Sequence, residues 1–182
     1  MIKVFDRVYI GKDDECFTSR VGWVTVHACK SPCHQSAVGY KGSLPAIHPN
    51  YLVLETDSNL FLNLIDPPVP LFQKESFDAF LEFAAKQYQD GNSLLIHCNR
   101  CESRAPSLAL LFLARKLKAI NNDSYQAASD EFIKLYPEYK PGQGIQTFMN
   151  ECWDGWNWNN EKFNLYNYSG SNSNACYIIF LD

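Results

Sequence analysis

The sequence predicts a three-layer α/β fold, in which a central and mostly parallel sheet is flanked by helices. The first observation is the segment 93–97 (SLLIH), a short apolar run typical of a strand buried on both faces of a sheet. The second is the strongly helical segment 106–119, which follows after a short loop. The third is the order of the remaining segments, mostly strands before this unit and helices after it. Such a chain is expected to place its functional loop between a strand and a helix, at the carboxyl end of the strand.

The composition bounds the class of protein. The chain has 182 residues, 46% of them hydrophobic, which suits one globular domain with a substantial core. Charged residues make up 20% and the net charge is −4, which argues against a nucleic-acid partner. No apolar run reaches the ~20 residues of a membrane span, and the amino terminus lacks the apolar stretch of a signal peptide. We therefore expect a cytoplasmic monomer with no membrane partner.

The amino-terminal part predicts four further strands. Segment 3–11 alternates apolar and polar residues, and segment 22–28 is rich in β-branched residues. Segments 51–55 and 60–65 are expected to be strands around a turn. Between these pairs, 29–50 holds several glycines and prolines and is predicted to be a long loop.

Helices are predicted in the rest of the chain. Apolar residues recur at helical spacing over 74–88, and Pro106 suits the first turn of the segment 106–119. Two more helices are expected within 121–137 and 143–153.

A change of composition divides the chain. Residues 1–153 are expected to form the domain, and 154–182, rich in Asn, Ser, Tyr and Trp, an appended tail that is either packed or flexible. Its last residues, 175–182, either add an edge strand or stay loose.

The loop between 93–97 and 106–119 contains a C-x5-R pattern, from Cys98 to Arg104. Backbone amides of such a loop and the positive end of the following helix favour an oxyanion such as phosphate. Arg104 can add two parallel hydrogen bonds to the same anion. Because the same field favours a thiolate, Cys98 is expected to be a nucleophile aimed at phosphorus.

Transfer of a phosphoryl group to a cysteine needs an acid for the leaving oxygen. Asp66 is the best candidate, because it follows a strand and precedes a proline-stiffened loop. Asp57 is a weaker candidate, since it lies in a plain turn.

The segment LLIHCNRCESRAPSLALLFLA (94–114) resembles the signature loop and following helix of the cysteine-dependent tyrosine and dual-specificity phosphatases. Their pattern is H-C-x-x-G-x-x-R-S/T, on which His97, Cys98 and Arg104 fall. Family members carry an acidic Asp ~30 residues before the cysteine, which leaves room for a helix and a strand, and Asp66 matches that placement. The resemblance covers residues 3–153 and suggests a bacterial or phage branch of small members.

The resemblance implies a hydrolase that acts on phosphate monoesters through a phosphocysteine, without a cofactor. The implied partner is a phosphorylated protein (on Tyr, Ser or Thr) or a small phosphoester. The resemblance also implies that the whole loop binds phosphate, through Asn99, Arg100, Cys101, Glu102, Ser103 and Arg104. His97 is expected to support that loop, and three residues are possible contributors to the cleft: His34, Gln143 and Gln146.

The chain departs from the family pattern at two positions. Cys101 stands where the family has glycine, and a left-handed backbone there costs a side chain ~1–2 kcal/mol. Ala105 stands where the family has a hydroxyl that donates to the cysteine sulfur. Its loss predicts slow breakdown of the phosphocysteine. A phosphate-binding pseudophosphatase with impaired turnover is therefore the main alternative function.

Two other patterns in the sequence involve cysteines. Cys98 and Cys101 form a C-x-x-C, which is typical of thiol oxidoreductases, and they could form a reversible disulfide in a phosphatase. A second cluster in the sequence consists of His27, Cys29, Cys33 and His34. Its spacing is not a common zinc pattern, and adjacent side chains on an extended segment point apart, so no metal site is expected.

Overall fold

The computed structural model describes residues 1–156, so the predicted tail from residue 157 onward, including its possible edge strand, lies outside the described residues. A six-stranded sheet has the order β1-β2-β6-β3-β5-β4. The strands are β1 (Ile2–Phe5), β2 (Val8–Gly11), β3 (Trp23–His27), β4 (Val53–Glu55), β5 (Asn59–Leu62) and β6 (Ser93–His97). The four inner strands are parallel, and β1 and β4 join the edges antiparallel. The predicted mostly parallel sheet is therefore confirmed.

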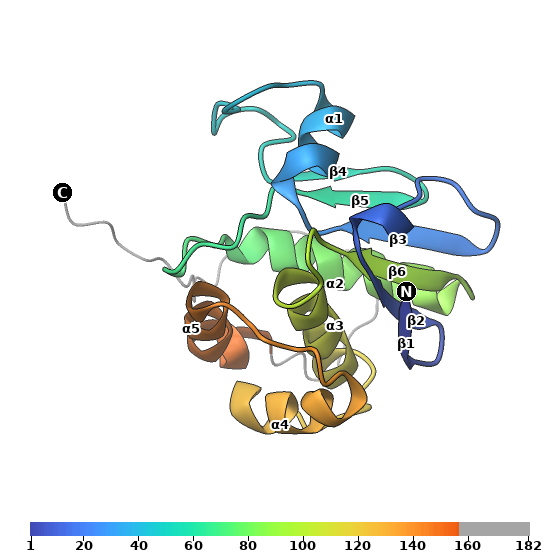
Figure 1. Ribbon diagram of the computed structural model, residues 1–182, viewed down its shortest axis with the longest axis vertical. Coiled ribbons are helices and arrows are strands. Elements are labelled where there is room, and N and C mark those ends of the chain that lie inside the picture. The colour runs from blue at the N-terminus through green and yellow to red at the C-terminus, as the bar shows by residue number, and fades with distance from the viewer. Residues whose placement is uncertain (157–182) are drawn as a thin grey trace, which may run out of the picture.

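Five α-helices accompany the sheet: α1 (Gln35–Val38), α2 (Lys74–Gln89), α3 (Arg104–Arg115), α4 (Tyr125–Leu135) and α5 (Gln143–Cys152). In Figure 1, α2 runs behind β6, α3, α4 and α5 lie below it, and α1 lies apart from them, above β4. Three short helical turns complete the described elements: η1 (Asp13–Glu15), η2 (Lys30–His34) and η3 (Trp153–Trp156). The α/β class with flanking helices is confirmed.

The unit β6–loop–α3 forms the centre of the molecule. β6 lies between β2 and β3, so both of its edges are paired. Every residue of α3 is buried, which explains why its sequence is apolar on all faces instead of along one stripe. A strand and a helix that are both held on all sides give the loop between them a rigid frame.

The structure differs from the predicted elements in three places. Residues 3–11 form a hairpin of β1 and β2 and not one strand, because the chain turns at Asp6 and at Arg7, whose φ is 53°. A turn without glycine or proline leaves the alternation of side chains uninterrupted in the sequence. The predicted loop 29–50 contains η2 and α1. The helix predicted from residue 106 begins at Arg104, so Arg104 belongs to its first turn.

The aromatic residues at the end of the described chain belong to the core. Trp156 is fully buried, and its ring packs against Phe77 of α2 and Phe148 of α5. The first residues of the predicted tail, up to Trp156, are therefore packed against the helices of the described chain.

Candidate active site

The residues of the C-x5-R pattern form one loop over the amino-terminal end of α3. Cys98 follows the last residue of β6 directly, and Arg104 is the first residue of α3. Cys98 is only 2% exposed, so the chain holds its sulfur at the base of the loop.

Contacts on the outside of the loop orient its peptide groups. The Tyr136 hydroxyl donates a hydrogen bond to the carbonyl oxygen of Cys101 (3.0 Å), and the Lys140 amide donates to that of Glu102 (2.7 Å). In a trans peptide the N–H points opposite to the C=O. The amides of Glu102 and Ser103 therefore point away from Tyr136 and Lys140, which leaves them available to an anion on the other side of the loop.

The surroundings of Cys98 favour its thiolate. A hydrogen bond from the Cys101 side chain, the Ala105 amide and the nearby Arg104 guanidinium together lower the pKa of Cys98 to about 6, although burial opposes the shift. The pKa of Cys101 is raised, because its thiol is the donor to Cys98 and is itself buried. At neutral pH the pair therefore carries its charge on Cys98 and its proton on Cys101.

Cys101 adopts a backbone conformation that favours glycine. Its φ is 58°, as expected from its position in the family pattern. Its thiol lies against the carbonyl oxygens of Gly11 and Cys98 as well as against the Cys98 sulfur. A thiol has one proton, so the Cys101 side chain can donate to only one of these acceptors at a time.

The Arg104 guanidinium is fixed by protein acceptors. One terminal nitrogen donates to the carbonyl oxygens of Leu64 (2.9 Å) and Ala28 (3.2 Å), and the other donates to Asn99 Oδ1 (2.8 Å). Within residues 1–156, the buried Nε–H has no hydrogen-bond partner. The side chain is thus oriented in advance and retains a donor for an anion.

Asn99 connects the loop to two other segments. Its amide nitrogen donates to Asp13 Oδ2 (3.2 Å) and to the Ser31 carbonyl oxygen (3.0 Å), while its oxygen accepts from Arg104. The position of Arg104 therefore depends on the segments around η1 and η2.

Asp66 lies at the loop, as the sequence predicted. Its side chain is exposed, and Oδ1 accepts a hydrogen bond from the Ser103 hydroxyl (3.0 Å). The same hydroxyl accepts a hydrogen bond from the Gly142 amide (3.0 Å), which joins the start of α5 to Ser103 and, through it, to Asp66. A Cβ on Gly142 would lie 2.8 Å from Asp66 Oδ1, and one on Gly144 would lie 2.4 Å from two carbonyl oxygens of the Asp66 loop. Gly142 and Gly144 therefore permit the close approach of the loop that contains Asp66, a role that the sequence pattern did not indicate.

Four of the remaining candidate residues are exposed, two on the loop and two on α5. Arg100 and Glu102 are exposed on the loop. Gln143 and Gln146 are exposed on α5, and Gln146 donates to the Pro141 carbonyl oxygen (3.0 Å).

The expectation that His34 lines the cleft is wrong. His34 is fully buried, and its ring nitrogens contact the Tyr40 hydroxyl and the Asn50 carbonyl oxygen (both 3.0 Å), so it holds the 29–50 loop together.

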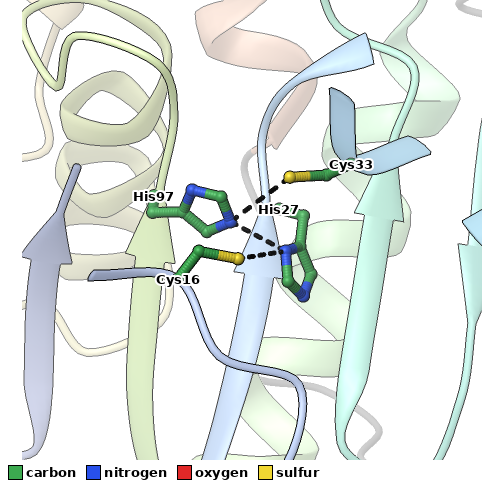
Figure 2. Close-up of side chains that lie close together, drawn as sticks. All are labelled: Cys16, His27, Cys33 and His97. Atoms are coloured by element: carbon green, nitrogen blue, oxygen red, sulfur yellow. Dashed lines mark hydrogen bonds between the residues drawn. The ribbon is translucent and has the colours of Figure 1, made fainter. Parts of the chain in front are cut away.

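His97 lies behind the loop in a second cluster. Its Nε2 lies 2.7 Å from His27 Nδ1 and 3.9 Å from Cys33 Sγ, and Cys16 Sγ lies 3.3 Å from the same His27 nitrogen (Figure 2). The four ligand atoms all lie within 4.8 Å of one another. The sequence cluster that included Cys29 and His34 is therefore replaced by one that includes Cys16 and His97, which sequence reasoning missed.

Comparisons with known proteins agree with the geometry. No family model and no curated protein matches the sequence. Solved structures do match. Human DUSP28 is 12% identical, with a TM-score of 0.59 over 85% of this chain and 96% of that one. DUSP15 is 15% identical, with a TM-score of 0.57 over 84% of this chain and 86% of that one. A human tyrosine phosphatase-like serine/threonine/tyrosine-interacting protein is 16% identical, with a TM-score of 0.56 over 82% of this chain and 92% of that one. The chain therefore has the fold of the dual-specificity phosphatases.

Over residues 1–156, no helix is both long and apolar enough to cross a membrane.

Proposed function

We propose that this chain, which has the dual-specificity phosphatase fold, hydrolyses phosphate monoesters through a phosphocysteine on Cys98. The observation that carries the proposal is the meeting of three groups at one loop. Cys98 lies at its base, Arg104 is oriented beside it with a free donor, and Asp66 is hydrogen-bonded to its rim through Ser103. A nucleophile, an anion-binding group and an acid are the parts that this reaction needs.

In the first step the Cys98 thiolate attacks phosphorus. The S–P bond forms as the P–O bond to the leaving group breaks. Protonated Asp66 gives its proton to the leaving oxygen, so an alcohol or phenol departs. Arg104 and the loop amides bind the non-bridging oxygens, where such fixed donors stabilise the charge of the transition state.

In the second step water attacks the phosphocysteine. Asp66, now a carboxylate, accepts a proton from the water as the S–P bond breaks, which restores the Cys98 thiolate and releases phosphate. Gln143 and Gln146 are exposed on α5, which approaches Asp66 through Gly142. We assign to them the positioning of this water.

The test is to trap the intermediate. The chain is denatured with acid during turnover of p-nitrophenyl phosphate, and its peptides are analysed by mass spectrometry. We expect phosphate on Cys98 and not on Cys101, together with release of inorganic phosphate. Turnover that leaves no phosphorylated Cys98 under rapid quenching, and is retained when Cys98 is alkylated, would contradict the mechanism.

A second candidate function is capture of phosphorylated partners without turnover. It is favoured by Ala105, which contributes only its backbone amide to Cys98 and no hydroxyl. Phosphopeptide binding by titration calorimetry, with no released phosphate and no phosphocysteine, would favour this alternative over the enzyme.

The two departures from the family pattern give a prediction. Cys101→Gly removes a hydrogen bond to the Cys98 thiolate, and a bond to a charged group contributes ~1.5–3 kcal/mol, so the pKa of Cys98 should rise and the rate at neutral pH should fall by ~2- to 15-fold with the thiolate fraction. Adding Ala105→Ser supplies a hydroxyl donor to the same sulfur and should restore the rate. Steady-state and burst kinetics of the two single variants and the double variant measure this coupling.

The result of the double variant decides whether these positions act on the sulfur. Equal rates for all four proteins would show that neither Cys101 nor Ala105 influences Cys98. Restoration by Ala105→Ser in the Cys101→Gly background supports the assigned role of the thiol.

A further inference from the structure

Two cysteines and two histidines from four separate segments meet behind the loop 98–104, which we call the phosphate loop. His27 and His97 are the last residues of β3 and β6 and are paired in register, so their side chains lie on the same face of the sheet. Cys16 follows η1 directly, and Cys33 lies in η2. Figure 2 shows the four side chains converging on one point from these different elements.

The dimensions of the cluster suit a small tetrahedral ion. With Zn–S near 2.3 Å and Zn–N near 2.0 Å, the ligand atoms of a tetrahedral site lie about 3.3–3.8 Å apart. Here three of the separations between ligand atoms are 2.7, 3.3 and 3.9 Å, and all four atoms lie within 4.8 Å of one another. Small side-chain rotations therefore bring the set to ligand geometry. Two sulfurs with two imidazole nitrogens are a typical zinc donor set.

A hydrogen bond on the far side of His27 prepares its ligand nitrogen. His27 Nε2 lies 3.0 Å from Asn59 Oδ1, and the Asn59 amide nitrogen donates to the Thr18 carbonyl oxygen (2.9 Å). The amide is thus oriented with its oxygen toward His27, which places the imidazole proton on Nε2. The Nδ1 lone pair then faces the cluster, in the arrangement that commonly orients metal-bound histidines.

The cluster without a cation is poor in acceptors. The single lone pair of His27 Nδ1 is approached by both the Cys16 thiol and His97 Nε2. Only one of these donors can use it. A divalent cation would let all four groups act as electron-pair donors, with the two thiols losing their protons to solvent.

We propose that Cys16, His27, Cys33 and His97 bind a structural Zn²⁺ that holds the base of the phosphate loop. With four protein ligands the site is closed, so the ion takes no part in the reaction. The two segments that contain Cys16 and Cys33 also hold Asn99. Its amide nitrogen donates to Asp13, shortly before Cys16, and to Ser31, shortly before Cys33. Through Asn99 the metal would fix the segments on which the orientation of Arg104 depends.

The test measures metal and not activity, so its outcome is independent of the proposed phosphatase function. The full chain, expressed with zinc and purified under reducing conditions, is expected to contain about one zinc per chain. The double variant Cys16→Ser/Cys33→Ser should lose at least nine-tenths of it. Cys29→Ser is the matched control, because Cys29 is a buried thiol beside Cys33 but is not one of the four ligands. It should retain the metal.

A measurement on the wild-type chain covers the case in which the double variant does not fold. After removal of zinc, Co²⁺ should give the intense visible bands of a tetrahedral site and the near-ultraviolet absorption of thiolate bound to cobalt. Absence of these bands in the folded wild type, zinc retained by the double variant, or a Cys16–Cys33 disulfide in the reduced preparation would each overturn the proposal.

Discussion

Replacing Cys98 by serine is expected to lower phosphatase turnover by about 10⁴–10⁶-fold, the order found when a covalent nucleophile is removed. A serine hydroxyl at neutral pH is a weak nucleophile without an adjacent base. The thiolate, by contrast, is stabilised by Cys101, the Ala105 amide and Arg104, which lower the pKa of Cys98 to about 6. The turnover number with p-nitrophenyl phosphate measures the loss.

The same variant should still bind phosphate analogues. Arg104 is held by main-chain oxygens of Ala28 and Leu64 and by Asn99, none of which depends on the sulfur. The dissociation constant for a phosphopeptide should therefore change only a few-fold, while turnover is lost. Cys152→Ser is the control for loss of a buried thiol, since Cys152 lies buried on α5. Substantial turnover by Cys98→Ser would exclude the phosphocysteine mechanism.

Replacing Asp66 by asparagine is expected to lower turnover by about 10²–10⁴-fold for substrates with poor leaving groups, the range of general acid catalysis. The asparagine oxygen can still accept the Ser103 hydrogen bond, so the loop geometry is retained. For p-nitrophenyl phosphate, whose phenolate leaves readily without a proton, the loss should be much smaller. A series of aryl and alkyl phosphates measures this dependence on the leaving group.

A neighbouring aspartate provides the control for this prediction. Asp57 is exposed in the turn before β5, and its backbone carbonyl, not its side chain, accepts a hydrogen bond from Gln87. Asp57→Asn should therefore leave all rates unchanged. If Asp66→Asn affected every substrate equally, Asp66 would be a structural contact of Ser103 and not the acid.

The sequence alone was sufficient to predict the central unit of strand, loop and helix. The apolar strand 93–97, the loop and the helix after it are contiguous, so their signals reinforce one another. Asp66 was predicted as the acid because it follows a strand, precedes a proline-stiffened loop and matches the placement of the family's acidic Asp before the cysteine. The left-handed backbone of Cys101 also followed from its position in the pattern, and its φ of 58° agrees.

The tertiary structure decided the contacts between segments that are distant in the chain. His27 and His97 face each other only because β3 and β6 are neighbours and in register, which no local pattern reveals. His34, adjacent to Cys33 in sequence, is directed instead toward Tyr40 and Asn50.

The support of Arg104 likewise comes from distant backbone, at Ala28 and Leu64. Periodicity and turn signals act over a few residues, whereas strand order and register are set by the packing of the whole core. The sequence therefore determined the strand, loop and helix on which the proposed chemistry depends, and only the packed sheet decided what orients the side chains of the loop and which other side chains meet behind them.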